Sequence, residues 1–255
     1  RRIKMIKGFR CSLTDENVSF DECVKCSEAG VLPCKLTTTY LQLLSSNLTE
    51  EHSFPSVSVL TNCPRQLFFT RKNDVFVKPS DMYYMFRGTM IHGILSKLKE
   101  DDPEAMVEQP ITVKLSNYSL SGRIDYYKKG HLVDYKNISE IYYKGGKAMY
   151  LPKPAHIQQV SLYAWGLTQA GEKIEKVSIE YYSPSDMVQC DIPLKDVLSE
   201  KYLKLAELQL NKILTAINTD TAPKYQNCIS EFEWMCDKYC VVKDICMKHL
   251  KKGGE

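Results

Sequence analysis

The chain has 255 residues, with 34 lysines and arginines against 31 aspartates and glutamates, a formal net charge of +3. This length favours one large domain, or one domain with a small appendage, and the ordinary apolar and charged fractions are typical of a globular protein. The balanced total charge says little about partners. Basic residues do cluster near both ends and at Lys144 and Lys147, a pattern that permits a nucleic-acid partner.

Composition also excludes a membrane span, because no apolar run approaches the roughly 20 residues that one needs. The first ten residues are basic and lack the apolar segment of a secretory signal, so we expect a cytoplasmic protein. Structural disulfides are rare in that compartment, yet the chain has ten cysteines. Clustered cysteines in a reducing compartment more often bind metal than pair with one another.

Hydrophobic periodicity predicts the elements in chain order. Residues 1–40 are short of apolar runs and form a cysteine-rich appendage, and residues 41–255 form the main domain. Helices are expected over 37–47, 56–69 with a break at Pro64, 87–99, 154–166 and 193–218. Strands are expected over 111–115, 120–127, 131–137 and 176–182, and the tail after Pro223 is expected to be irregular. This order predicts an α/β domain built around a mixed sheet.

The most informative stretch runs from Ser121 to Asn137. If Lys129 and Gly130 form a two-residue turn, Asp125 lies opposite Asp134, and Arg123 lies opposite Lys136. Like charges directly opposite each other are destabilising across strands. A divalent cation with a preference for oxygen ligands, such as magnesium or manganese, would remove that cost. The alternative is a solvated hairpin face with scattered charges.

Two predicted helices carry groups that could join such a site. His92 lies between Gly88 and Gly93, and close approach of a backbone or ligand is one reason to accept glycines in a helix. A neutral imidazole there could bind a metal. Gln159 and Tyr163 share a helix face with His156 and could contact phosphates or bases. A surface histidine and the polar edge of a core helix are the alternatives.

These motifs occur in a recognisable order. They are CPR at 63–65, RGTMIHGIL at 87–95, GRID at 122–125, VDYKN at 133–137, QQVSLYAW at 158–165 and a terminal cysteine group. The set resembles the RecB-like branch of the PD-(D/E)XK nucleases, most closely the CRISPR-associated RecB-like exonucleases and the nuclease domains of AddB. The likeness covers roughly residues 56–246.

The resemblance implies a restriction-endonuclease-like core, a mixed central sheet flanked by helices. It also implies roles for individual residues. His92, Asp125 and Asp134 match the family's ligands for Mg²⁺ or Mn²⁺, and Lys136 matches the catalytic lysine near the attacked phosphate. Gln159 and Tyr163 match the motif that helps to hold DNA near the site.

The cysteines fall into two groups. Cys236, Cys240 and Cys246 need a fourth ligand, and the resemblance implies that Cys63 completes a 4Fe-4S cluster. The spacing departs from the family, with three residues instead of two between Cys236 and Cys240. Cys228 is an alternative ligand, and zinc an alternative metal. The N-terminal group, which lies outside the resemblance, predicts a structural zinc site made by Cys11, Cys23, Cys26 and Cys34.

Together these features predict a metal-dependent DNA exonuclease that acts on DNA ends, with single-stranded DNA as its expected substrate. The resemblance implies a role in trimming DNA for CRISPR spacer acquisition, with the CRISPR integrase complex as partner. The alternatives are a nuclease of DNA repair or recombination and a non-catalytic iron–sulfur module that binds DNA. The paired Asp125 and Asp134 argue against the non-catalytic module, because a scaffold needs no facing carboxylates.

Overall fold

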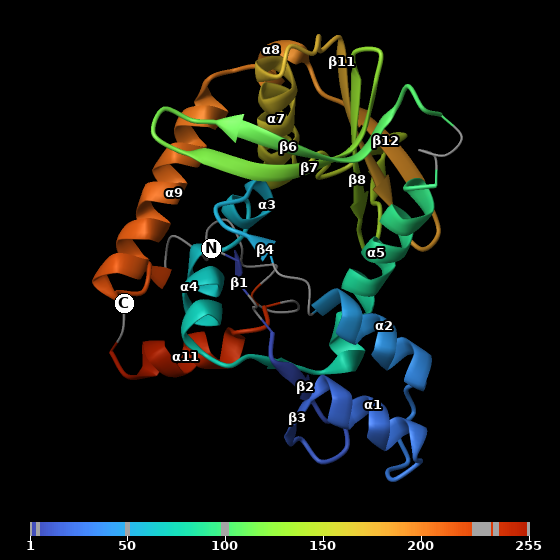
Figure 1. The fold of residues 1–255 in the computed structure, drawn as a ribbon. Helices are drawn as coiled ribbons and strands as arrows, with labels where there is room; N and C mark the ends of the chain where they lie inside the picture. The colour runs from blue at the N-terminus through green and yellow to red at the C-terminus, as the bar shows by residue number, and fades with distance from the viewer. Residues whose placement is uncertain are drawn as a thin grey trace. The chain divides into compact units, whose positions relative to one another are not determined.

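The structure is a computed structural model that describes residues 2–3, 6–48, 52–97, 102–225, 236 and 240–253 (Figure 1). The chain divides into two compact units. The first comprises Arg1–Phe54, Asn62–Tyr83 and Asn211–Glu255, and the second comprises Pro55–Thr61 and Tyr84–Leu210. Residues 1–40 therefore belong to a unit that also contains later segments, and the expected boundary after residue 40 stays a prediction.

A five-stranded sheet forms the centre of the second unit, with the strand order β12-β11-β8-β7-β6. The strands are β6 (Met106–Lys114), β7 (Ser119–Lys128), β8 (His131–Asn137), β11 (Lys176–Tyr182) and β12 (Met187–Asp191). Only the β8–β11 pair is parallel among these described strands, so the sheet is mixed. Pro110 is accommodated in β6 because that strand lies at the edge of the sheet.

Helix α7 (Pro154–Gln169) packs against β6, β7, β8 and β11. Pro154 suits the first turn of this helix, where its missing N–H costs nothing. Gly166 permits the close approach, since a Cβ there would lie only 2.9 Å from Ile111 Cδ1. The helices α3 (Val57–Leu60) and α8 (Leu194–Val197) also contact α7, while α5 (Tyr83–Leu95) carries His92. Buried aliphatic side chains of β7, β8, β11 and α7 form the core, including Ile124, Leu132, Ile179 and Leu162.

The first unit combines small sheets with helices. Strand β2 (Gly8–Arg10) pairs with β3 (Asn17–Ser19) and, in parallel, with β5 (Phe76–Val77), while β1 (Arg2–Ile3) pairs with β4 (His52–Ser53). Helix α1 (Phe20–Glu28) begins with a capping box made by Ser19 and Glu22, and it packs against α2 (Thr38–Leu48). Helix α4 (Pro64–Lys72) packs against α11 (Lys243–Lys251), and a short 3-10 helix, η1, spans Pro79–Met82.

The remaining elements are α9 (Lys201–Thr219) and the small hairpin of β9 (Tyr143–Lys144) and β10 (Lys147–Ala148). The expected single helix over 193–218 is wrong, because Leu198–Glu200 separate α8 from α9. The expectation of an irregular tail is wrong at α11, which is a regular helix that carries Cys246. None of the described helices combines the length and apolarity that crossing a bilayer requires.

Candidate metal centre

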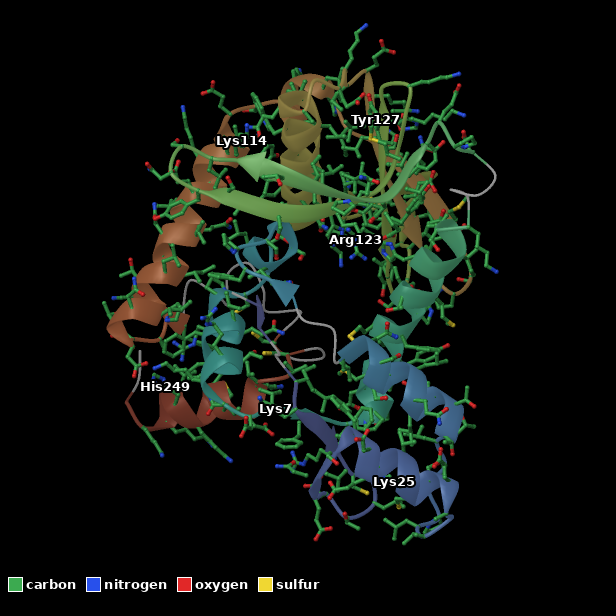
Figure 2. All side chains as sticks on the ribbon, viewed as in Figure 1. Lys7, Lys25, Lys114, Arg123, Tyr127 and His249 are labelled. Carbon is green, nitrogen blue, oxygen red and sulfur yellow. The ribbon has the colours of Figure 1, made fainter. Side chains whose placement is uncertain are left out.

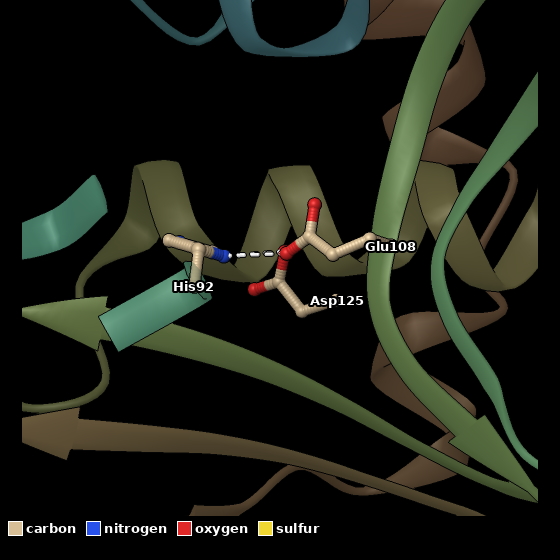
Figure 3. A group of neighbouring side chains, drawn as sticks. All are labelled: His92, Glu108 and Asp125. Atoms are coloured by element: carbon tan, nitrogen blue, oxygen red, sulfur yellow. Dashed lines mark hydrogen bonds and ion pairs between the residues drawn. The ribbon is translucent and has the colours of Figure 1, made fainter. Parts of the chain in front are cut away.

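Three side chains from three elements converge in the second unit. His92 comes from α5, Glu108 from β6 and Asp125 from β7, and their ligand atoms all lie within 4.8 Å of one another (Figure 3). His92 Nδ1 lies 2.8 Å from Glu108 Oε1 and 3.6 Å from Asp125 Oδ1. We call these three residues the acidic group. One imidazole and two carboxylates are a donor set that could hold a divalent metal ion.

Glu108 was not among the candidate residues from the sequence. It lies between Val107 and Gln109, which pair with Tyr126 and Ile124 on β7, so continuing this register brings Glu108 opposite Asp125. Its φ of 49° is a left-handed conformation that a glutamate seldom adopts, and such strained residues cluster at functional sites. The missed signal is the two-residue turn Ser116–Asn117 between β6 and β7, because that turn sets this register.

The β7–β8 hairpin has the predicted turn. Lys128 faces His131, and both turn residues have positive φ, 45° at Lys129 and 83° at Gly130. The regular ladder extends to Tyr126 and Val133, and beyond it Asp125 Oδ2 accepts a 2.7 Å hydrogen bond from the Tyr135 main-chain N–H. Burial, followed by the nearby charge of Asp134, raises the pKa of Asp125 to about 7.

Asp134, which is buried, and Lys136 form an ion pair whose charges act on Asp125 of the acidic group. Lys136 Nζ lies 2.7 Å from Asp134 Oδ2. Burial opposes the charged form of Lys136, but the carboxylates of Asp134 and Asp125 outweigh it and raise the pKa of this lysine. Asp134 is 1% exposed, and among the described residues its Oδ1 atom has no hydrogen-bond partner. A buried carboxylate oxygen without a partner is costly, and a cation beside it would offset that cost.

His92 is held in place by the two carboxylates. The hydrogen bond to Glu108 raises its pKa, burial opposes that rise, and Asp125 adds to it. Close approach of another backbone does not explain the glycines on either side of His92, because a Cβ at Gly88 or Gly93 would meet no described atom within 4 Å. The same helix exposes the large apolar side chains of Met90 and Ile94.

The residues predicted to hold DNA lie on α7. Gln159 Nε2 donates to Tyr163 Oη at 3.0 Å, so the two side chains do share a face. Tyr163 is only 4% exposed, and its contact with DNA stays a prediction. His156, on the same helix, hydrogen-bonds to the Tyr181 hydroxyl at 3.1 Å. Burial, with smaller contributions from Lys136 and Lys153, lowers the pKa of His156 to about 2, so this ring is neutral.

An exposed cation stands beside the acidic group. Arg123 pairs with Pro110 across β6 and β7, and its guanidinium lies 3.7 Å from Glu108 Oε2 (Figure 2). Its side chain is 64% exposed, in contrast to the 17% of Lys136. Arg123 therefore offers a positive charge that an anionic ligand can reach from solvent.

In the first unit, the late cysteines meet at one cavity. Its lining includes Cys63, Cys236, Cys240 and Cys246. Burial raises the pKa of Cys240 to about 11, and the other three thiols contribute to the rise. Four neighbouring thiols could provide the ligands of a metal or cluster, and the identity of that group stays a prediction. Cys228, the alternative ligand, lies outside the described residues.

The N-terminal cysteines are also neighbours in the first unit. Cys23 and Cys26 lie one helical turn apart on α1. Burial raises the pKa of Cys23 to about 11, with further contributions from Cys34, Cys11 and Cys26. The other three thiols affect the pKa of Cys23 because they lie close to it. Zinc at this group stays a prediction.

Comparisons with known proteins show the fold alone. No protein-family model matches the chain, and no curated protein matches it. The crystal structure of the protein SSO0001 is similar, with a TM-score of 0.54 and 22% identity, over 81% of this chain and 93% of that one. A provisionally named exonuclease from Eubacterium rectale has a TM-score of 0.37 and 15% identity, over 80% of this chain and 82% of that one. The fold is thus a mixed α/β arrangement with a central mixed sheet flanked by helices.

Proposed function

We propose that the protein is a metal-dependent nuclease that hydrolyses phosphodiester bonds of DNA. The observation that carries the proposal is the convergence of His92, Glu108 and Asp125, together with the Asp134–Lys136 ion pair whose charges act on Asp125. The unpartnered Oδ1 of Asp134 and the two carboxylates of the acidic group suit a hard divalent cation such as Mg²⁺ or Mn²⁺. Bound there, such an ion would lower the pKa of a water molecule and polarise a phosphate.

The chain's own residues have separate tasks in this proposal. Asp125 is held by the Tyr135 N–H, so its remaining oxygen keeps a fixed direction towards His92. Lys136 is 17% exposed and keeps its charge, so it can stabilise negative charge that develops on the attacked phosphate. The exposed Arg123 would contact a phosphate before it reaches the acidic group.

A cleavage assay with end-labelled DNA tests the proposal. We expect cleavage that depends on added Mn²⁺ or Mg²⁺ and falls by about 100-fold or more in Asp125→Asn and Lys136→Met. The matched control is Asp102→Asn, which removes the half-buried partner of Lys128 and should cleave as the parent does. Parent protein that leaves DNA intact with either metal, or variants that cleave as the parent does, would contradict the proposal.

The finer assignment rests on the sequence motifs. We propose an exonuclease that acts on single-stranded ends, with a role in DNA trimming for CRISPR spacer acquisition and the CRISPR integrase complex as its partner. Repair or recombination is the nearest alternative, and the gene neighbourhood distinguishes the two. We also propose that the late cysteines hold a 4Fe-4S cluster with a structural role. They line one cavity of the first unit, whereas the acidic group belongs to the second unit.

A further inference from the structure

The β9–β10 hairpin of the second unit concentrates exposed aromatic and basic side chains. Tyr142 is 56% exposed, Tyr143 is 48% exposed and Tyr150 is 81% exposed. Isolated apolar side chains on a surface are ordinary, but three large rings within nine residues are not. We call Tyr142–Tyr150 the tyrosine hairpin. The Tyr142 and Tyr143 side chains hydrogen-bond to Glu140 and Asp186, while about half or more of each of the three side chains stays exposed to a ligand.

The turn of the tyrosine hairpin places two lysines opposite each other. Gly145 and Gly146 have φ values of 58° and 75°, which suit a tight two-residue turn. The turn brings Lys144 directly opposite Lys147, and both lysines are exposed. Like charges in this position repel each other, and an anion between them would relieve the repulsion. The tip of the hairpin therefore favours a phosphate.

The tyrosine hairpin also lies next to the proposed nuclease site along the chain. It begins five residues after Asn137, where β8 ends, and α7 begins four residues after Tyr150. The β8 strand carries Asp134 and Lys136, and α7 carries Gln159 and Tyr163. The connecting segment is anchored, because the Ile138 N–H donates to the Tyr182 carbonyl and the Met149 N–H donates to the Tyr142 carbonyl. The tyrosine hairpin is thus joined directly to the two elements that carry residues we assign to cleavage.

We infer that the tyrosine hairpin is a binding platform for single-stranded DNA, an inference that rests on the proposed nuclease function for its choice of ligand. Unpaired bases stack on exposed aromatic rings, and lysines beside those rings neutralise the phosphates. Tyr142 and Tyr150 supply the stacking surfaces, while Lys144 and Lys147 bind the backbone. Bases within a duplex are already stacked, so the platform selects single strands.

Binding is tested with the full chain and a fluorescein-labelled oligothymidylate, by anisotropy without added divalent cation. We expect Tyr142→Ala with Tyr150→Ala to weaken binding by about ten-fold or more, and the corresponding double Phe variant to bind as the parent does. A blunt duplex of the same length should bind both variants equally. Unfolding temperatures of the variants should match that of the parent, because these side chains are exposed.

Charge reversal provides the second arm. The slope of log affinity against log salt is negative. Lys144→Glu with Lys147→Glu should make it less steep by about 1.4, since each single-strand phosphate contact contributes about 0.7. The matched control is Lys195→Glu with Lys204→Glu, which reverses two exposed charges elsewhere in the second unit. Unchanged oligothymidylate affinity in the Tyr-to-Ala variant, or an equal loss of duplex binding, would overturn the inference.

A third measurement separates this inference from the proposed function. Hydrolysis of the small diester bis(p-nitrophenyl) phosphate needs no strand platform, so the Tyr-to-Ala variant should retain the parent's rate. If the parent fails to hydrolyse any diester but the variant still loses oligothymidylate binding, the proposed function fails and the platform stands. If the parent hydrolyses the diester and the Tyr-to-Ala variant binds oligothymidylate as the parent does, the platform is refuted and the proposed nuclease function is retained.

Discussion

Gly122 on β7 and Tyr163 on α7 are in such close contact that a Cβ at Gly122 would lie 2.7 Å from Tyr163 Cε1. The absence of a side chain at Gly122 thus determines where the tyrosine ring lies. Tyr163 Oη accepts the hydrogen bond from Gln159. Burial, followed by the nearby charge of Asp134, raises the pKa of the Tyr163 phenol. A glycine in the sheet therefore positions a side chain predicted to hold DNA.

Gly122→Ala should displace the Tyr163 ring. We expect a loss of about 1–3 kcal/mol in the free energy of unfolding, as for other overpacked cores, together with weaker DNA cleavage. Urea unfolding and the cleavage assay measure the two effects. Gly93→Ala is the matched control, because its Cβ would meet no described atom and alanine favours a helix by about 0.5–1 kcal/mol. Equal stability of Gly122→Ala and the parent would refute the close contact.

Glu108→Gln should weaken metal binding. Manganese at about 100 times its dissociation constant should stabilise the parent by about 2.7 kcal/mol, which raises the unfolding temperature by about 2–4 °C for each kcal/mol. The variant loses a charged ligand and should show a smaller rise. Glu104→Gln, which removes an exposed partner of Lys129, should respond as the parent does. The same rise in all three proteins would exclude Glu108 as a ligand.

Cys63→Ala should destabilise the first unit. Cys63 is 4% exposed and lines the cavity of the late cysteines, so its loss removes one proposed cluster ligand. Protein purified without oxygen should be brown, and the variant should lose the colour and unfold at a lower temperature. Cys190→Ala, on β12 in the second unit, is the control that should keep both. Full iron content in Cys63→Ala would make Cys228 the leading fourth ligand.

Cys23→Ser with Cys26→Ser should remove zinc from the N-terminal group. The parent should contain about one zinc ion per chain, because four neighbouring thiols suit tetrahedral zinc. Metal analysis by mass spectrometry measures the zinc content. Zinc-free parent protein from zinc-supplemented expression would contradict the assignment, whereas iron in its place would change only the metal.

His131 should make stability depend on pH. Its ring lies 2.8 Å from the Ser178 hydroxyl, and burial, with the charge of Lys176, lowers its pKa. The unfolded chain takes up this proton at about pH 6.5 and the folded chain does so only at lower pH. The contribution is therefore fully present above about pH 6.5 and declines as the pH falls below it. His131→Gln should lose less stability between pH 8 and pH 5.5 than the parent, as measured by urea unfolding.

Local patterns were enough to predict several elements of both units. The Lys129–Gly130 turn needs only two residues to fix its geometry, and β8 and β11 have the predicted bounds. The helices over 37–47 and 56–69, including the break at Pro64, are confirmed as α2, α3 and α4. The mixed α/β fold class is confirmed as well.

Features that depend on long-range pairing were not predicted. Glu108 joins the acidic group only through the register between β6 and β7, and nothing in its immediate sequence marks it. The break between α8 and α9 falls at Leu198–Glu200, without a proline or glycine to indicate it. Helix α11 has a single buried residue, Cys246, so it lacks the apolar stripe that would indicate a helix.

The left-handed backbone at Glu108 sets stability and metal binding against each other. Glycine or asparagine adopts a φ of 49° at lower cost than glutamate, so either replacement would relieve local strain. Each would also remove a carboxylate from beside His92 and Asp125. A selection for thermal resistance alone would therefore favour the loss of Glu108, whereas a selection for metal-dependent activity would retain it.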